Sequence, residues 1–258
     1  MNYRSQTLAA VIVTFNNVGT IERALESLRW VDELIVVDGG STDGTLEIVR
    51  RFTKKIHFHP SDSQTVLRQF AFSLVKSDWV LSLNPHEWVE EMLRHEVDGV
   101  LLNVPEEVFG FSVPLKTYFM GQWVQKGGNL KRELRMFRKG NGTVVPDTKD
   151  ALIVVPGEVE ALERPIGREP YGNLDDIARV INQRSTHGAY KLLEAGGNLG
   201  WRASLFNVLM RPLWIFFYRY IVRLGFTQGF GGLVMALSQS YETFLKYTKF
   251  RTLCLRQV

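Results

Sequence analysis

Cysteine is almost absent from the sequence, which has a single Cys254 among 258 residues. One thiol excludes a disulfide framework and any zinc site built from cysteines. We therefore expect the protein to reside in a reducing compartment.

Long hydrophobic runs are also lacking. One early Arg4 is followed by only six consecutive apolar residues, 8–13, before Thr14. This run is shorter than the apolar core of a signal peptide, so we expect the protein to stay in the cytoplasm. The longest charge-free stretch, residues 224–241, is diluted by four glycines, two serines, two glutamines and a threonine, and we expect it not to span a membrane.

Acidic residues are scarce in the last 58 residues, which contain eight Lys or Arg against one acid, Glu242. The same segment holds 13 of the 30 aromatic residues, and Arg211, Arg219 and Arg223 are spaced to lie on one side of a helix. A basic, aromatic segment is typical of binding to an anionic membrane or to nucleic acid. We favour a segment lying on the membrane, because the rest of the chain offers nothing to read bases, and we expect no nucleic-acid partner. Core packing between two helices is the alternative explanation for the aromatic residues.

The composition, 45% hydrophobic and 22% charged, is that of a globular protein. Short apolar runs alternate with amphipathic stretches, which is the pattern of βαβ units. The pattern predicts an α/β fold with a mostly parallel sheet and helices on both faces. The first four strands are expected at residues 8–13, 34–37, 56–58 and 79–83, with one helix opened by Asn16 or Asn17 and another over residues 64–75.

The later segments predict a different organisation. Residues 108–120 and 133–137 resemble antiparallel strands, residues 144–155 a loop running into a strand, and Asn173 the cap of a helix. Two helices are expected from about residue 202, broken near residues 225–232. We expect a domain over residues 1–200 and a C-terminal amphipathic helical segment, residues 201–258, that associates with a membrane.

Three loops are expected where ligands bind in an open parallel sheet, beyond the carboxyl ends of the strands. They are residues 14–17, 38–43 and 84–87. The sequence has no G-x-G-x-x-G after the first strand and no Walker lysine, so neither a dinucleotide site nor a P-loop is supported.

The residues of the first two loops carry a family resemblance. Val-Ile-Val-Thr-Phe-Asn-Asn (residues 11–17) and Ile-Val-Val-Asp-Gly-Gly-Ser-Thr-Asp-Gly-Thr (residues 35–45) resemble the start of family 2 glycosyltransferases of the GT-A fold. The likeness continues through residues 78–83, 87–88, 116–121, 132–138, 211–214 and 243–247. Over this length the sequence resembles the small bacterial enzymes that add a glucose-type sugar to the lipopolysaccharide core.

The resemblance implies a donor site for a UDP-sugar. Thr14, Phe15 and Asn16 match the loop that holds the nucleotide base, Asp38 matches the acid that binds uracil, and Arg68 falls where the family has a basic residue near the diphosphate. Helix capping is the alternative role of Thr14 and Asn16. For residues 38–43 a turn and cap is the alternative, and both roles can hold together.

The sequence departs from the family at the fourth strand, where an Asp-x-Asp motif is replaced by Asn84-Pro85-His86, followed by Glu87. The paired carboxylates of that motif usually hold Mg²⁺ or Mn²⁺ against the diphosphate. Glu87 keeps one negative charge and His86 offers a second ligand, so we expect a divalent cation to be bound here with altered ligands. Weakened metal binding and a donor held in another way are the open alternatives.

Further roles follow from position within the resemblance. Asp150 is the candidate base that takes the proton of the acceptor hydroxyl, with Asp147 as the fallback and a plain surface aspartate as the alternative. Arg132, Arg135 and Arg138 are candidates for contact with the diphosphate or an acceptor phosphate, against solvated charge.

The resemblance therefore implies an inverting glycosyltransferase on the inner face of the cytoplasmic membrane. It would move a hexose, most simply glucose, from a UDP-sugar to a lipid-linked saccharide acceptor such as the lipopolysaccharide core. Because the Asp-x-Asp motif is degraded, the alternative is a non-catalytic relative that acts as a binding or scaffolding partner.

Overall fold

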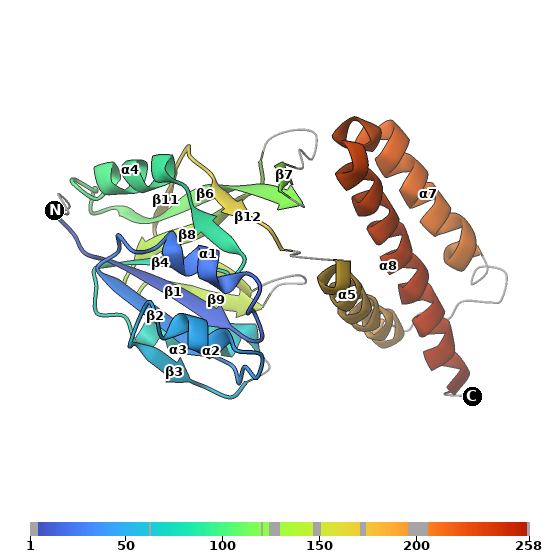
Figure 1. Ribbon diagram of the computed structural model, residues 1–258, viewed down its shortest axis with the longest axis horizontal. Coiled ribbons are helices and arrows are strands. Elements are labelled where there is room, and N and C mark those ends of the chain that lie inside the picture. The colour runs from blue at the N-terminus through green and yellow to red at the C-terminus, as the bar shows by residue number, and fades with distance from the viewer. Residues whose placement is uncertain are drawn as a thin grey trace. The chain divides into compact units, whose positions relative to one another are not determined.

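A computed structural model describes residues 5–61, 63–119, 121–123, 130–146, 151–170, 174–195 and 206–256. The chain forms two compact units (Figure 1). The first comprises Met1–Tyr118 and Gly128–Pro170, and the second comprises Phe119–Gly127 and Tyr171–Val258.

The first unit is built on a mixed β-sheet (Figure 1). Its parallel half has the order β3-β2-β1-β4 and consists of β1 (Leu8–Thr14), β2 (Glu33–Asp38), β3 (Ile56–Phe58) and β4 (Trp79–Leu83). The order continues through β8 (Arg132–Arg138), β6 (Val108–Phe119), β12 (Ile166–Arg168) and β5 (Glu87–Val89). β8 is antiparallel to both β4 and β6, so β6 and its parallel neighbour β12 run in the same direction as β4.

Four smaller strands complete the β structure of the described residues. β11 (Glu158–Ala161) pairs with β6 in parallel, and β9 (Thr143–Pro146) and β10 (Ala151–Val154) form a separate antiparallel pair. β7 (Gln122–Trp123) follows β6 in the chain.

Helices cover both faces of the sheet, so β1 is buried on both of its faces. Leu8, Ala10 and Ile12 pack in one core cluster with residues of α1 (Ile21–Glu26), α2 (Thr45–Val49) and α4 (Glu91–Val100). The alternate residues Ala9 and Val11 pack in a second cluster with residues of α3 (Gln64–Ser73). A strand buried on both faces reads as a continuous apolar run, which is the signal that the sequence carried.

The predicted early strands and the helix over residues 64–75 are confirmed, with α3 ending two residues early. The first helix begins at Ile21. The backbone N–H of Ile21 donates a hydrogen bond to the carbonyl of Asn17 at 3.0 Å. The antiparallel strands are confirmed by β6 and β8. Helix α4 and the short strands β5, β11 and β12 were not predicted.

The second unit is helical. Its helices are α5 (Leu174–Glu194), a continuous helical run formed by the π-helical η1 (Phe206–Met210), α7 (Arg211–Phe217) and the π-helical η2 (Tyr218–Val222), then the short η3 (Gly225–Gln228) and α8 (Gly229–Arg256). α8 packs against α5 and α7. The predicted break between two late helices is confirmed near residue 224, where Leu224 has a positive φ of 55°.

Polar contacts fasten α5 to α8. The Lys249 ammonium on α8 donates to the Oγ atoms of Ser185 at 2.8 Å and Thr186 at 2.7 Å, and to the carbonyl oxygen of Asn182 at 2.9 Å. Ile177 and Ile181 are buried beside Phe119 and pack with Leu245. These contacts place α5 in the compact unit that contains α8, and the compact units divide near residue 171. A membrane-associating segment over residues 201–258 stays a prediction. Among the described helices, none combines the length and apolarity needed to cross a bilayer.

Candidate active site

The expected loops lie at one edge of the sheet in the first unit. Thr14 and Asp38 end the neighbouring parallel strands β1 and β2 and are register partners. Asn84 follows β4, which is parallel to β1 on its other side. The carboxyl ends of adjacent parallel strands are where open α/β sheets bind ligands.

The loops after β1 and β2 are linked by side-chain hydrogen bonds. Asn16 has a positive φ of 53°, and its side-chain oxygen accepts from the Thr42 N–H at 2.8 Å, while its own N–H donates to the Ser41 hydroxyl at 2.9 Å. The buried Thr14 hydroxyl donates to the side-chain oxygen of Asn17 at 3.0 Å. Neither Thr14 nor Asn16 caps α1, so the capping alternative is wrong, and their bonds instead fix the loop that presents Phe15, whose side chain is 53% exposed.

Asp38 has the turn-forming role that the sequence suggested. Its buried carboxylate accepts from the N–H groups of Gly40 at 3.1 Å and Ser41 at 3.0 Å, and from the Ser41 hydroxyl at 2.5 Å. These bonds hold the second loop beside the first. A role in base recognition stays a prediction.

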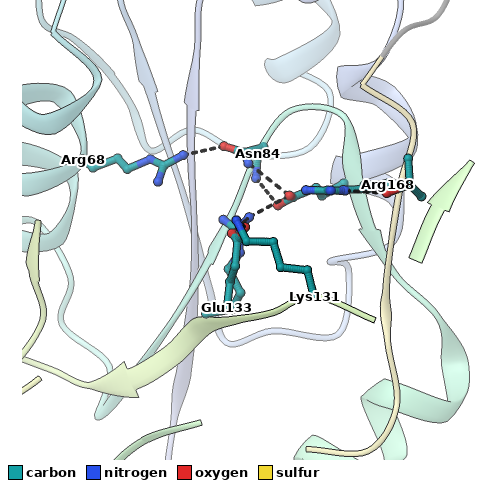
Figure 2. A network of polar contacts seen from close by, with 8 residues as sticks. Arg68, Asn84, Lys131, Glu133 and Arg168 are labelled. Atoms are coloured by element: carbon teal, nitrogen blue, oxygen red, sulfur yellow. Dashed lines mark hydrogen bonds and ion pairs between the residues drawn. The ribbon is translucent and has the colours of Figure 1, made fainter. Parts of the chain in front are cut away.

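A chain of polar contacts begins at the end of β4 (Figure 2). The buried Arg68 on α3 donates from Nη2 to Asn84 Oδ1 at 2.6 Å. The backbone N–H of Asn84 donates to Glu87 Oε2 at 2.9 Å and its side-chain amide donates to Glu87 Oε1 at 3.0 Å. Arg135 on β8 is 2.8 Å from both Glu87 Oε1 and Glu133 Oε2, and Lys131 is 2.7 Å from Glu133 Oε1.

This network keeps its carboxylates ionised in a buried place. Burial raises the pKa of Glu87, but Arg135, His86 and the bonds from Asn84 outweigh it, so the pKa lies below its ordinary value. Burial likewise raises the pKa of Glu133, and Arg135 and Lys131 lower it further than burial raises it.

The residues at the end of β4 do not fit a divalent cation. Mg²⁺ and Mn²⁺ need accessible oxygen ligands. Glu87 is fully buried, and its two carboxylate oxygens already accept bonds from Asn84 and Arg135. Across the described ranges, no three His, Cys, Asp or Glu side chains are grouped to hold a metal ion. The expected pairing of Glu87 with His86 as metal ligands therefore does not fit this geometry.

The three candidate arginines of β8 separate. Arg135 joins the network, whereas Arg132 donates to the carbonyl of Leu162 at 2.5 Å and Arg138 donates to the carbonyl of Val108 at 2.7 Å. Arg138 is the register partner of Trp79 at the start of β4, the end opposite to Asn84. The structure therefore brings Arg135 to the site and leaves Arg138 at the far edge. Asp150 and Asp147 lie outside the described residues.

Arg168 also lies at this edge of the sheet, although the sequence assigned it no role. It ends β12, which runs in the same direction as β4, so Arg168 reaches the same edge as Asn84. Its register partners are Glu87 on β5 and Thr117 on β6, and its Nε donates to Thr117 Oγ1 at 2.8 Å. The three-residue strand has no periodic signal of its own, so only pairing reveals this position.

A stacked layer lies beside the network. The Arg23 guanidinium lies 3.3 Å from the centre of the Trp88 ring and 3.7 Å from the Glu169 carboxylate. A Cβ at Gly167 would lie 2.3 Å from the Trp88 ring, so glycine is required for the ring to pack against β12. Tyr118, 5.4 Å from Trp88, donates its hydroxyl to Glu90 at 3.2 Å.

The chain is similar to known proteins over most of its length. The family model described as Glycosyl transferase family 2 matches residues 9–145. An uncharacterized glycosyltransferase of Rickettsia felis is 25% identical over 264 residues, covering 97% of this chain and 92% of that protein. The lipopolysaccharide core biosynthesis glycosyltransferase LpsC of Rhizobium meliloti is 26% identical over 257 residues, covering 94% of this chain and 91% of that protein. A crystal structure of S. aureus TarS in complex with UDP matches with a TM-score of 0.44 at 16% identity, covering 97% of this chain and 91% of that one.

Proposed function

The chain belongs to glycosyl transferase family 2, and we propose that it transfers a hexose, most simply glucose, from a UDP-sugar to a lipid-linked saccharide such as the lipopolysaccharide core. The reaction would take place on the inner face of the cytoplasmic membrane. The relative named for lipopolysaccharide core biosynthesis supports this choice of acceptor.

The donor half of the proposal is supported by the two linked loops. Phe15 is exposed between the fixed Thr14 and Asn16, and Asp38 lies at the end of the adjacent strand. An exposed ring with neighbouring amide and carboxylate groups suits a uracil base, which stacks on aromatic rings and has hydrogen-bonding edges.

The single observation that carries the lipid-linked acceptor is an exposed apolar stripe on the second unit. Phe206, Met210, Leu213, Phe217 and Ile221 follow one another at helical spacing and are 43–62% exposed. Soluble proteins rarely expose a continuous row of this kind, which is typical of a helix that lies in a membrane interface.

Cations beside this apolar stripe favour an anionic membrane. Burial lowers the pKa of Arg219, and the neighbouring Arg223 lowers it further. Burial and Arg211 lower the pKa of Lys246 in the same way. Glu242 opposes both shifts, but like charges held this close would be relieved by anionic lipid headgroups.

The proposed reaction is a direct displacement with inversion. The acceptor hydroxyl oxygen forms a bond to the anomeric carbon as the bond from that carbon to the diphosphate oxygen breaks, and UDP leaves with the electron pair. A base takes the hydroxyl proton, and Asp150 is the proposed base.

The experiment compares transfer to a lipid-linked acceptor in anionic vesicles with transfer to the same saccharide freed of lipid. The double variant Trp214→Ala with Phe217→Ala removes two exposed rings. We expect it to lose vesicle binding and transfer to the lipid-linked acceptor, and to keep transfer to the free saccharide. The control Met92→Ala with Leu102→Ala removes exposed apolar groups from the first unit. Equal transfer by both double variants in vesicles would contradict the membrane role.

A further inference from the structure

We propose that Arg168 binds the diphosphate of the donor directly, with Arg68 and Arg135 as positioning residues, and that donor binding needs no divalent cation. This inference rests on the proposed function, because it assumes that the ligand is a nucleoside diphosphate. It replaces the expected metal by fixed positive charge within the protein.

Both oxygens of the Glu87 carboxylate already accept hydrogen bonds within the protein. A carboxylate that serves as a metal ligand must turn a lone pair toward the ion. Here one oxygen accepts from Asn84 Nδ2 and Arg135 Nη2, and the other accepts from the Asn84 backbone. Binding a cation would require breaking a buried ion pair, which is strongly unfavourable. Glu87 therefore orients Asn84 and Arg135.

The network holds three cationic side chains and two carboxylates, and Arg168 adds a fourth cation at the same edge of the sheet, so this edge has an excess of two positive charges. The cations are Arg68, Lys131, Arg135 and Arg168, and the carboxylates are Glu87 and Glu133. The diphosphate of a UDP-sugar carries two negative charges at neutral pH, so the excess matches the ligand.

Flanking charges do not cancel this excess. Arg23 pairs with Glu169 at 3.7 Å. Tyr118 and, to a lesser degree, Glu90 raise the pKa of Lys116, and Glu90 also accepts the Tyr118 hydroxyl. Each of these pairs is neutral. The Nε atom of Arg135 is buried without a hydrogen-bond acceptor in the described part of the chain, which also indicates that donors exceed acceptors here.

The three arginines differ in how far their side chains are exposed to a ligand. Arg168 is partly exposed, whereas Arg68 is 6% and Arg135 3% exposed, so Arg168 is the arginine of the three best placed to meet a ligand. Its bond to Thr117 fixes Nε, and the residue lies at the carboxyl edge of the sheet as the register partner of Glu87. A guanidinium can donate two parallel hydrogen bonds to phosphate oxygens. The same contact would neutralise the charge that UDP gains as the glycosidic bond breaks.

The test is calorimetric titration of UDP, and separately of uridine, into the full-length protein with EDTA or with Mn²⁺. We expect the UDP dissociation constant to agree within about twofold under the two conditions. Arg168→Gln should weaken UDP binding about ten- to hundredfold, the effect of losing hydrogen bonds to a charged group, and leave uridine binding unchanged. The matched control Arg164→Gln removes the same charge from an exposed position four residues earlier, and we expect a change below about threefold.

Each outcome decides one of the two proposals. UDP binding that requires Mn²⁺ would overturn the inference and leave the proposed function in place. Equal losses for UDP and uridine in Arg168→Gln would also overturn it, because a folding defect does not discriminate between them. Arg168→Lys should restore part of the UDP affinity, since it keeps the charge and loses the paired donors. If neither ligand binds under either condition, the proposed function itself fails.

Discussion

Replacing Glu87 by glutamine should destabilise the first unit by about 3 kcal/mol. Glu87 is fully buried and 2.8 Å from Arg135, which is itself 3% exposed. Removing one member of a buried ion pair costs about 3–5 kcal/mol because the remaining charge is left uncompensated. Arg135 keeps Glu133 as a second partner at 2.8 Å, so the low end of this range applies. The new amide group would also place a donor against the donors of Asn84.

The assay is urea unfolding of the full-length protein followed by tryptophan fluorescence. Hydrogen exchange in peptides that cover β1 and β4 reports the first unit separately from the helical one, since two compact units need not unfold together. The single variants Glu87→Gln and Arg135→Met are compared with the double variant in a double-mutant cycle.

The double-mutant cycle can refute the claim that the buried ion pair stabilises the site. If the network acts as described, the double variant is more stable than the sum of the single losses predicts, with a coupling of about 2 kcal/mol. Additive losses, or a Glu87→Gln protein within about 0.5 kcal/mol of the wild type, would show that the buried pair does not stabilise the site.

Three other results are expected. The pKa of Glu87 is lowered in the folded protein, so the ionised carboxylate stabilises the fold fully above the ordinary pKa of 4.5, and this stabilisation is lost as the pH falls through the lower folded pKa. Urea titrations from about pH 6 to about pH 2 should therefore show a smaller loss of unfolding free energy in Glu87→Gln than in the wild type. Gly167→Ala places a methyl group 2.3 Å from the Trp88 ring, so we expect a loss of about 1–3 kcal/mol and an altered near-ultraviolet circular dichroism spectrum, and an unchanged spectrum would contradict the packing. Lys249→Met removes the bonds to Ser185 and its neighbours on α5, so amide exchange should quicken about fivefold in residues 174–194, a loss of about 1 kcal/mol, and stay unchanged in β1.

The sequence predicted the parallel half of the sheet because burial on both faces leaves a clear signal. All seven residues of β1 and all five of β4 are buried, and Pro85 lies two residues after the end of β4. Short strands in the other half carry no such pattern. β5 and β12 have three residues each and depend on pairing with each other, which no local spacing reveals.

The helix α4 was missed for a related reason. Its burial rests on Leu93 and Val97, and its N-cap residue Glu90 makes no capping hydrogen bond through its side chain. With two buried residues in ten and no capping signal, the segment resembles a polar connection.

The sequence predicted individual residues of the candidate site but not the side-chain contacts between them. The sequence showed that Asn84 replaces an acid and that Glu87 remains, but not that Glu87 faces Arg135, 48 residues away. Nor could it show that Arg68 holds Asn84 or that Arg168 shares the edge with both. These contacts join separate helices and strands, so they depend on how the chain folds in three dimensions.

The measurement that tests the central claim most directly is mass spectrometry of a lipid-linked saccharide acceptor incubated with UDP-hexoses and the full-length protein. The account predicts that one hexosyl residue is added per acceptor with equal release of UDP, and that the yield persists in EDTA. An acceptor that keeps its mass with every UDP-hexose, with and without Mn²⁺, while the protein still binds UDP, would contradict it and favour a non-catalytic binding partner.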